Sequence, residues 1–199
     1  MIKNIVFDLG RVLVDFDPRA YIAAFGYTEE TVDRLLSTVF GPDWYYHDRG
    51  DIRTIDELRA IEIEKHPDLK KEIGEVLDGD WVRIHTLKTA TAEYLADLKR
   101  RGYRIYILSN LSVESYEFIS KYPFFGLTDG GVFSYRERAC KPEPAIYRAL
   151  LDRYALAPEE TLFFDDVAEN IAGAEALGIR GVLFRDIEQV KREAEPLLG

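Results

Sequence analysis

Residues 2–10 read IKNIVFDLG, an apolar run of β-branched and aromatic residues that ends in an acidic residue, Asp8. The same pattern recurs in YRIYILSN at residues 103–110 and in TLFFDD at residues 161–166. Short apolar runs of this composition predict buried β-strands. With two further runs of the same kind, the predicted strands cover residues 2–7, 103–108, 131–135, 161–164 and 181–184.

Helical patterns separate these strands in the second half of the chain. They cover residues 90–101, 112–121, 144–154 and 169–177, and each ends near Gly or Pro. Gly102 and Gly178 each follow a helix, where a left-handed backbone conformation is expected. Because strands that alternate with helices form parallel sheets covered on both faces, the sequence predicts an α/β fold with a Rossmann-like sheet.

Residues 16–88 have a different pattern, without a convincing strand. Helices are predicted at residues 29–40, 55–65 and 69–77, and a loop rich in aromatic and charged residues at 41–52. We therefore expect an α/β core domain made of residues 1–15 and 89–199, with residues 16–88 inserted into it as a helical cap domain.

The composition excludes several classes of protein. The chain has 199 residues with a formal net charge of −10, so nucleic acid is not an expected partner. No apolar stretch approaches the ~18 residues that a membrane span needs, so no membrane partner is expected either. A single cysteine, Cys140, and the lack of a signal-peptide pattern favour a cytoplasmic location.

Polar residues follow three of the predicted strands. Because ligands bind at the carboxyl ends of the strands in an open parallel sheet, these residues should share one rim. They are Asp8, Ser109, Asn110, Asp165 and Asp166, and Lys141 precedes a helix in the segment CKPEP. Repulsion among three carboxylates would be relieved by a divalent cation, which prefers oxygen ligands.

In this order, the residues resemble the four motifs of the haloacid dehalogenase-like (HAD) hydrolases. That family has a nucleophilic Asp after the first strand, matched by Asp8, and a Ser or Thr after the second, matched by Ser109. Its Lys is matched by Lys141, and its acidic pair by Asp165 and Asp166. The helical insertion resembles the family's C1-type cap. The strings HDRGDI at 47–52 and KPEPAIY at 141–147 are most similar to bacterial sugar-phosphate phosphatases, typified by α-D-glucose-1-phosphate phosphatase.

The resemblance implies a small phosphate ester as substrate and Mg²⁺ as cofactor. Asp8 would attack phosphorus to form an aspartyl-phosphate that water hydrolyses. Lys141 would hold Asp8 and a phosphoryl oxygen, while Ser109 and the amides around Asn110 would donate hydrogen bonds to other phosphoryl oxygens. The metal site would consist of Asp8, the Gly10 carbonyl oxygen and Asp166, supported from beside by Asp165.

Gly10 departs from the pattern of most phosphatases of this family, which carry a second Asp at this position as general acid. An anomeric sugar phosphate tolerates this loss better than an alkyl phosphate because its leaving group departs more easily. Gly10 also keeps two alternatives open. One is a metal-free 2-haloacid dehalogenase, in which the aspartate attacks carbon, and the other is a phosphate- or partner-binding protein without turnover.

Substrate choice is expected to lie in the cap, because the core binds only the phosphoryl group and the metal. Within residues 44–53, His47, Asp48 and Arg49 could contact substrate hydroxyls or a second charge, and the aromatic residues could stack on a sugar ring. The alternative is that these side chains simply pack the cap.

Overall fold

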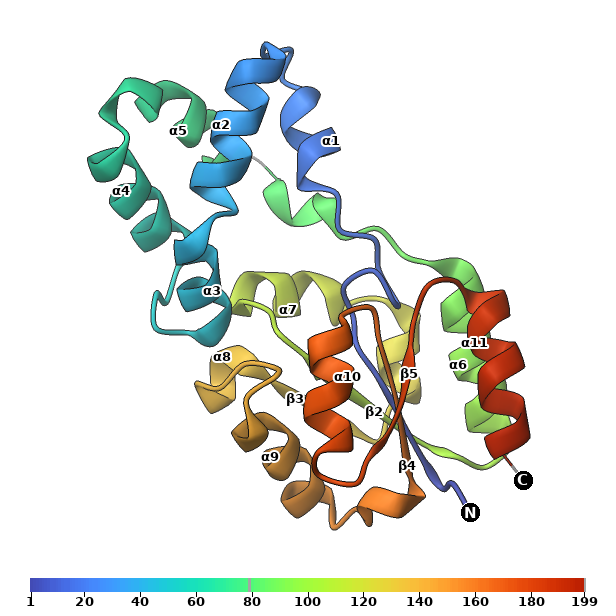
Figure 1. The fold of residues 1–199 in the computed structure, drawn as a ribbon. Helices are drawn as coiled ribbons and strands as arrows, with labels where there is room; N and C mark the ends of the chain where they lie inside the picture. Colours follow the sequence, from blue (N-terminus) through green and yellow to red (C-terminus); the bar gives the residue numbers. More distant parts are fainter. Residues whose placement is uncertain (79, 199) are drawn as a thin grey trace.

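A computed structural model describes residues 1–78 and 80–198 of the chain (Figure 1). Within these residues, one parallel sheet has the strand order β3-β2-β1-β4-β5. The strands are β1 (Asn4–Phe7), β2 (Arg104–Ser109), β3 (Gly130–Phe133), β4 (Thr161–Asp165) and β5 (Arg180–Leu183). This sheet confirms the predicted α/β fold class, and it places the first strand at the centre.

Alternate residues of the central strands enter two separate cores, one on each face of the sheet. Ile5 and Phe7 of β1 pack with the first core, which α6 and α11 cover, whereas Val6 packs with the second, which α9 and α10 cover. The helices of this part of the chain are α6 (Thr89–Arg100), α7 (Val113–Ile119), α8 (Ser134–Glu137), α9 (Pro144–Tyr154), α10 (Ala168–Glu175) and α11 (Ile187–Ala194). Burial on both faces explains why the strands are continuously apolar.

The helices between β1 and α6 form a lobe beyond the carboxyl edge of the sheet (Figure 1). They are α1 (Pro18–Ala23), α2 (Glu29–Val39), α3 (Pro42–Arg49), α4 (Ile55–Lys65) and α5 (Lys70–Asp78), followed by the 3-10 turn η2 (Trp81–Ile84). This lobe is called the cap below, and it has its own apolar core. In that core, the rings of Trp44 and Trp81 meet edge to face, with their centroids 5.2 Å apart.

Two chain segments connect the cap to the sheet, and they are paired by hydrogen bonds. The amide of Asp15 donates to the carbonyl of Thr86 at 2.7 Å, and the amide of Lys88 donates to the carbonyl of Leu13 at 2.9 Å. The entering and leaving segments thus form a short two-stranded connection, which positions the cap over the ends of β1 and β2.

The expectation of a loop at residues 41–52 is wrong, because residues 42–49 form helix α3. Pro42 stands at the first turn, and Gly50 ends the helix in the left-handed conformation with φ of 81°. A Cβ at Gly50 would lie 2.5 Å from the carbonyl oxygen of Tyr135, so the close approach of the cap to the core also requires glycine here.

Smaller differences lie at element ends. The predicted strand at 131–135 ends at Phe133, because Ser134 and Tyr135 begin α8. Helix α1 was not predicted; Asp17 caps it by accepting a hydrogen bond from the amide of Ala20. Gly102 and Gly178 have φ of 94° and 83°, which confirms the two predicted helix ends. Among the described residues, no helix combines the length and apolar character needed to cross a bilayer.

Candidate active site

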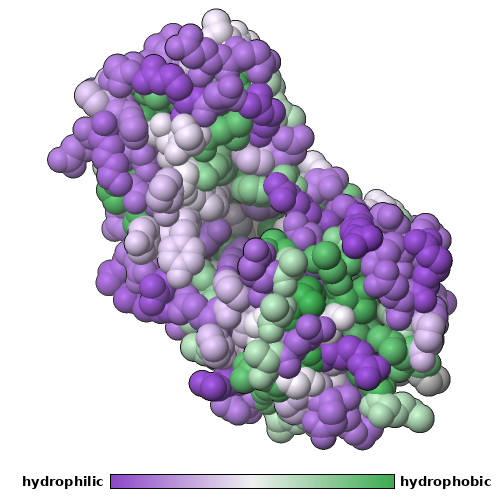
Figure 2. Space-filling model, in the orientation of Figure 1, coloured by the Kyte–Doolittle hydropathy of each residue, from purple (hydrophilic) through white to green (hydrophobic). Residues whose placement is uncertain are grey.

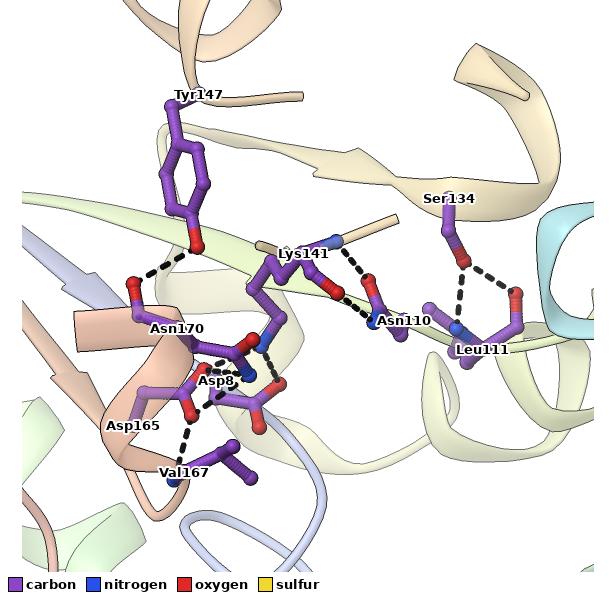
Figure 3. Close-up of polar contacts among 9 residues, drawn as sticks. All are labelled: Asp8, Asn110, Leu111, Ser134, Lys141, Tyr147, Asp165, Val167 and Asn170. Carbon is purple, nitrogen blue, oxygen red and sulfur yellow. Dashed lines mark hydrogen bonds and ion pairs between the residues drawn. The ribbon is translucent and has the colours of Figure 1, made fainter. Parts of the chain in front are cut away.

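Lys141 lies buried between two carboxylates at the carboxyl ends of adjacent strands (Figure 3). Its Nζ is 2.8 Å from Oδ1 of Asp8, which follows β1, and 2.5 Å from Oδ2 of Asp165, which ends β4. Asp8 and Asp165 come side by side because β1 and β4 pair in register, with Phe7 opposite Phe164. The sequence-predicted Asp8, Lys141 and Asp165 therefore form one cluster.

The electrostatics of this cluster follow from burial. Burial raises the pKa of Asp8 to about 6, although Lys141 acts in the opposite direction. Burial disfavours the charge on Lys141, but the carboxylates of Asp8 and Asp165 outweigh this and raise its pKa. The lysine therefore stays protonated, and it holds Asp8 in the anionic form that a nucleophile requires at neutral pH.

Asp165 has little free capacity for a ligand. Its Oδ1 accepts hydrogen bonds from the amide of Val167 at 2.8 Å and from Nδ2 of Asn170 at 3.0 Å. Its Oδ2 accepts from Lys141 and, at 3.2 Å, again from Asn170. These partners occupy both oxygens, so Asp165 fixes the position of Lys141 and has few lone pairs left for a metal (Figure 3).

Asp166 is placed differently. Among the described residues, its half-buried side chain has one ionic neighbour, Nη1 of the exposed Arg11 at 3.7 Å. Burial, assisted by the charge of Asp165, raises the pKa of Asp166, which is the expected effect of an uncompensated carboxylate in this cluster. Ligand oxygens of Asp8, Asp165 and Asp166 lie within 4.8 Å of one another. Such a set fits a hard divalent cation, with Asp8 and Asp166 having the free oxygens.

Residues at the carboxyl end of β2 lie beside Lys141 and Asp8. The Asn110 side chain makes a reciprocal pair with the Lys141 backbone, donating to its carbonyl at 3.0 Å and accepting from its amide at 2.8 Å. The Ser109 side chain acts to lower the pKa of Asp8, against the larger effect of burial. The Asn110 side chain is thus engaged with Lys141, and substrate binding by Asn110 would use its backbone.

A cavity of about 290 Å³ opens over this cluster, and Figure 2 shows the surface hollowed between the two lobes. Its floor is polar and includes Asp8, Gly10, Ser109, Asn110, Lys141 and Asp166. The lining also includes the apolar residues Phe16 and Trp44 from the cap and Leu111 and Ile119 from the core. The polar residues suit a phosphoryl group, and the apolar residues could contact the remainder of a small ligand.

Of the residues that the structure describes, the cap contributes two ionisable side chains to the cavity wall, Asp48 and His85. Asp48 was among the predicted contact residues, whereas His85 was missed, because no motif or spacing in the sequence connects it to the strand ends. His85 stacks on Phe16 with ring centroids 5.4 Å apart, and its Nε2 lies 3.0 Å from Oγ of Ser115 in α7.

The other two predicted cap residues lie outside the described cavity wall. Nδ1 of His47 lies 3.2 Å from the carbonyl of Ile52, and its Nε2 lies 3.3 Å from a carboxylate oxygen of Glu114 in α7. Arg49 donates from Nε to the carbonyl of Arg138 at 2.9 Å. Both side chains connect the cap to the core, and substrate binding by either stays a prediction.

Comparisons with known proteins agree with this geometry. The family model of haloacid dehalogenase-like hydrolases matches residues 2–178. D-ribitol-5-phosphate phosphatase of Bacteroides thetaiotaomicron is 31% identical over 198 residues, covering 89% of each chain. A crystal structure of a HAD family enzyme from that organism, in complex with magnesium and inorganic phosphate, is 26% identical with a TM-score of 0.71, covering 93% of this chain and 95% of that one. Drimenol cyclase of Aspergillus calidoustus is 26% identical over 202 residues, which span 37% of its length.

Proposed function

Because the chain belongs to the haloacid dehalogenase-like hydrolase family, we propose that it is a Mg²⁺-dependent phosphatase of small phosphomonoesters, sugar phosphates in particular. The observation that carries the proposal is the cluster of Asp8, Lys141 and Asp166 on the floor of one cavity. A nucleophilic carboxylate held beside a buried ammonium group and a free acidic group is suited to attack on an anionic phosphoryl group.

Each residue has a role in the proposed reaction. Asp8 attacks phosphorus in line and becomes the aspartyl-phosphate, which water then hydrolyses. Lys141 reduces the repulsion between Asp8 and the phosphoryl oxygens, and the hydroxyl of Ser109 donates a hydrogen bond in the same region. Asp8, the Gly10 carbonyl oxygen and Asp166 would hold the ion, with Asp165 in support. When bound, Mg²⁺ neutralises negative charge on the phosphoryl group and orients that group.

The substrate proposal rests on the resemblance, on the relative that acts on ribitol 5-phosphate and on the size of the cavity. At about 290 Å³, the cavity is at the small end of the ~300–1,000 Å³ of ordinary ligand sites. That volume favours a small phosphate ester. Glucose 1-phosphate and ribitol 5-phosphate are therefore the first two esters to compare.

The dehalogenase alternative is disfavoured by the charge of the site. A 2-haloacid is itself a carboxylate, and Asp166 would repel it on the same cavity floor. Metal-free attack on carbon also has no use for the free oxygens of Asp166. A protein without turnover is the other alternative, and it would bind phosphate without releasing it from any ester.

The test is phosphate release from a panel of sugar phosphates with Mg²⁺ and with a chelator. The proposal predicts release that depends on Mg²⁺. If no ester releases phosphate while the protein is folded, halide release from 2-haloacids separates the dehalogenase from the non-catalytic alternative.

A further inference from the structure

Gly10 stands where most phosphatases of the family have the Asp that protonates the leaving oxygen. The segment that carries Asp8 therefore supplies no general acid. Apart from Gly10 and its two chain neighbours, no heavy atom of the described residues lies within 4 Å of the place where a Cβ would stand at Gly10, and the backbone there is outside the left-handed region. A small side chain could therefore stand at this position, and glycine supplies none. A proton for the leaving oxygen must come from elsewhere in the cavity or from solvent.

Among the described residues, the ionisable side chains that line the cavity are those of Asp8, Arg11, Asp48, His85, Lys141 and Asp166. Asp8 is the nucleophile, and Lys141 is held protonated between two carboxylates. Arg11 does not release its proton at ordinary pH. Asp166 belongs to the metal site. Only Asp48 and His85, both from the cap, remain of this set as proton donors.

The two cap residues differ in their state of protonation. Burial lowers the pKa of His85 to about 4, so this side chain is neutral near pH 7 and a poor acid. Burial raises the pKa of Asp48 to about 7, so a large fraction of this carboxyl group holds a proton at neutral pH. A group with a pKa near the working pH suits general acid and general base catalysis.

The position of Asp48 is fixed by both lobes. It lies one turn after Trp44 on α3, and the Trp44 side chain and the Ser112 backbone act to lower the pKa of its carboxyl group, against the larger effect of burial. Its own carbonyl accepts from Oγ of Ser134 at 2.5 Å. Trp44 lines the cavity beside it. Asp48 is thus held at the cavity wall, beside the loop that follows Ser109.

We propose that Asp48 of the cap is the general acid and base of the reaction, in place of the side chain that Gly10 lacks. The inference rests on the proposed phosphatase function. As the Asp8 oxygen bonds to phosphorus, the bond from phosphorus to the leaving oxygen breaks, and that oxygen takes the proton of Asp48. The Asp48 carboxylate then takes a proton from the water that attacks phosphorus, while the bond from phosphorus to Asp8 breaks. Both residues return to their starting states.

The first test compares the wild type with Asp48→Asn on esters of different leaving groups, with Mg²⁺ present. Asparagine keeps the shape of the side chain and removes its acidic proton. We expect kcat/KM for an alkyl phosphate, glucose 6-phosphate, to fall by ~10²-fold or more, and that for p-nitrophenyl phosphate by less than ~3-fold, since its leaving group needs no proton. Equal losses on both esters, or no loss on either, would overturn the proposal.

Asp56→Asn is the matched control, because Asp56 is an exposed cap acid whose side chain is 76% accessible and lies outside the cavity wall. In this control, kcat/KM for glucose 6-phosphate and kcat/KM for p-nitrophenyl phosphate should both stay at the wild-type values. A wild type that releases phosphate from no ester would instead refute the proposed function itself, so the two failures are distinguishable.

A second variant tests whether a general acid at position 10 can replace Asp48. Gly10→Asp places a carboxyl group in the open space beside Asp8. We expect it to raise kcat/KM for the alkyl phosphate by at least ~10-fold in the Asp48→Asn background, and by less in the wild-type background. A gain in the variant background no larger than that in the wild type would contradict the proposal.

The pH profile provides a third readout. The charged or titratable groups around Asp48 are His47 on its own helix, Glu114 from α7, and Cys140 before α9. The acid must be protonated, so kcat/KM for the alkyl phosphate should fall as the pH rises through the pKa of Asp48. This alkaline limb should be absent in Asp48→Asn. An unchanged limb in that variant would assign it to another group and overturn the proposal.

Discussion

The ammonium group of Lys141 lies 2.8 Å from Oδ1 of Asp8, and both side chains are buried at the carboxyl end of the central strand. The nucleophile proposed here is therefore paired with a cation before any substrate or metal binds. A buried carboxylate without such a partner would take up a proton and lose its nucleophilicity.

Asp8→Asn should abolish turnover while the fold is retained. The amide is close in shape to the carboxylate but cannot form the covalent intermediate, so phosphate release should fall by roughly 10³-fold or more. Circular dichroism and thermal unfolding check the fold in parallel. A folded variant with a rate within tenfold of the wild type would refute the role of Asp8 as nucleophile.

Lys141→Met should destabilise the protein in the absence of metal. The change leaves Asp8 and Asp165 facing each other without their shared cation, and breaking a buried ion pair typically costs about 3–5 kcal/mol. Urea unfolding in the presence of a chelator measures the loss. Lys191→Met removes an exposed lysine that pairs with Glu188, and it should cost less than ~1 kcal/mol. Similar losses in the two variants would contradict the account of Lys141.

Mg²⁺ should stabilise the wild type but not Asp166→Asn. A ligand at about 100 times its dissociation constant contributes ~2.7 kcal/mol to folding. Asp166 has free oxygens in the cluster, so its loss should remove most of this effect, which thermal unfolding with and without Mg²⁺ measures. If Asp166→Asn keeps the full Mg²⁺-dependent shift, the ion binds elsewhere.

His85 should make the folded state sensitive to acid. Its pKa of about 4 in the folded protein is below the ordinary 6.5, so the unfolded chain binds the additional proton between these values. Stability is therefore lost as the pH falls, by about 2 kcal/mol from pH 6.5 to pH 5. Urea unfolding at the two pH values should show a smaller loss for His85→Gln. His66→Gln, which removes a histidine whose side chain is 40% accessible, should keep the wild-type loss; equal losses in all three proteins would refute the assignment.

The sequence was sufficient to predict the sheet, because each strand is a short apolar run whose two faces enter different cores, as Ile5 and Val6 do. It also predicted that Asp8 and Asp165 would lie together, since residues at the ends of neighbouring parallel strands share one rim. Helix α3 was missed because the many polar and aromatic residues at 41–52 obscured its signals, which are Pro42 and Gly50.

Which cap residues line the cavity could not be predicted from the sequence. His85 enters it because the segment after η2 runs back beside residues 13–15, a contact between distant parts of the chain. His47 and Arg49 lie next to Asp48 in sequence, yet they bond to Glu114 and to the Arg138 carbonyl. Successive residues of a helix point in different directions, so proximity in the sequence alone did not reveal which would face the ligand.

The most direct measurement is mass spectrometry of the enzyme quenched in acid during turnover of a phosphate ester with Mg²⁺. The account predicts one phosphoryl group on the peptide that contains Asp8, absent when a chelator replaces the metal and absent in Asp8→Asn. Phosphate release by an enzyme whose Asp8 is never modified, or a phosphoryl group on another residue, would contradict it.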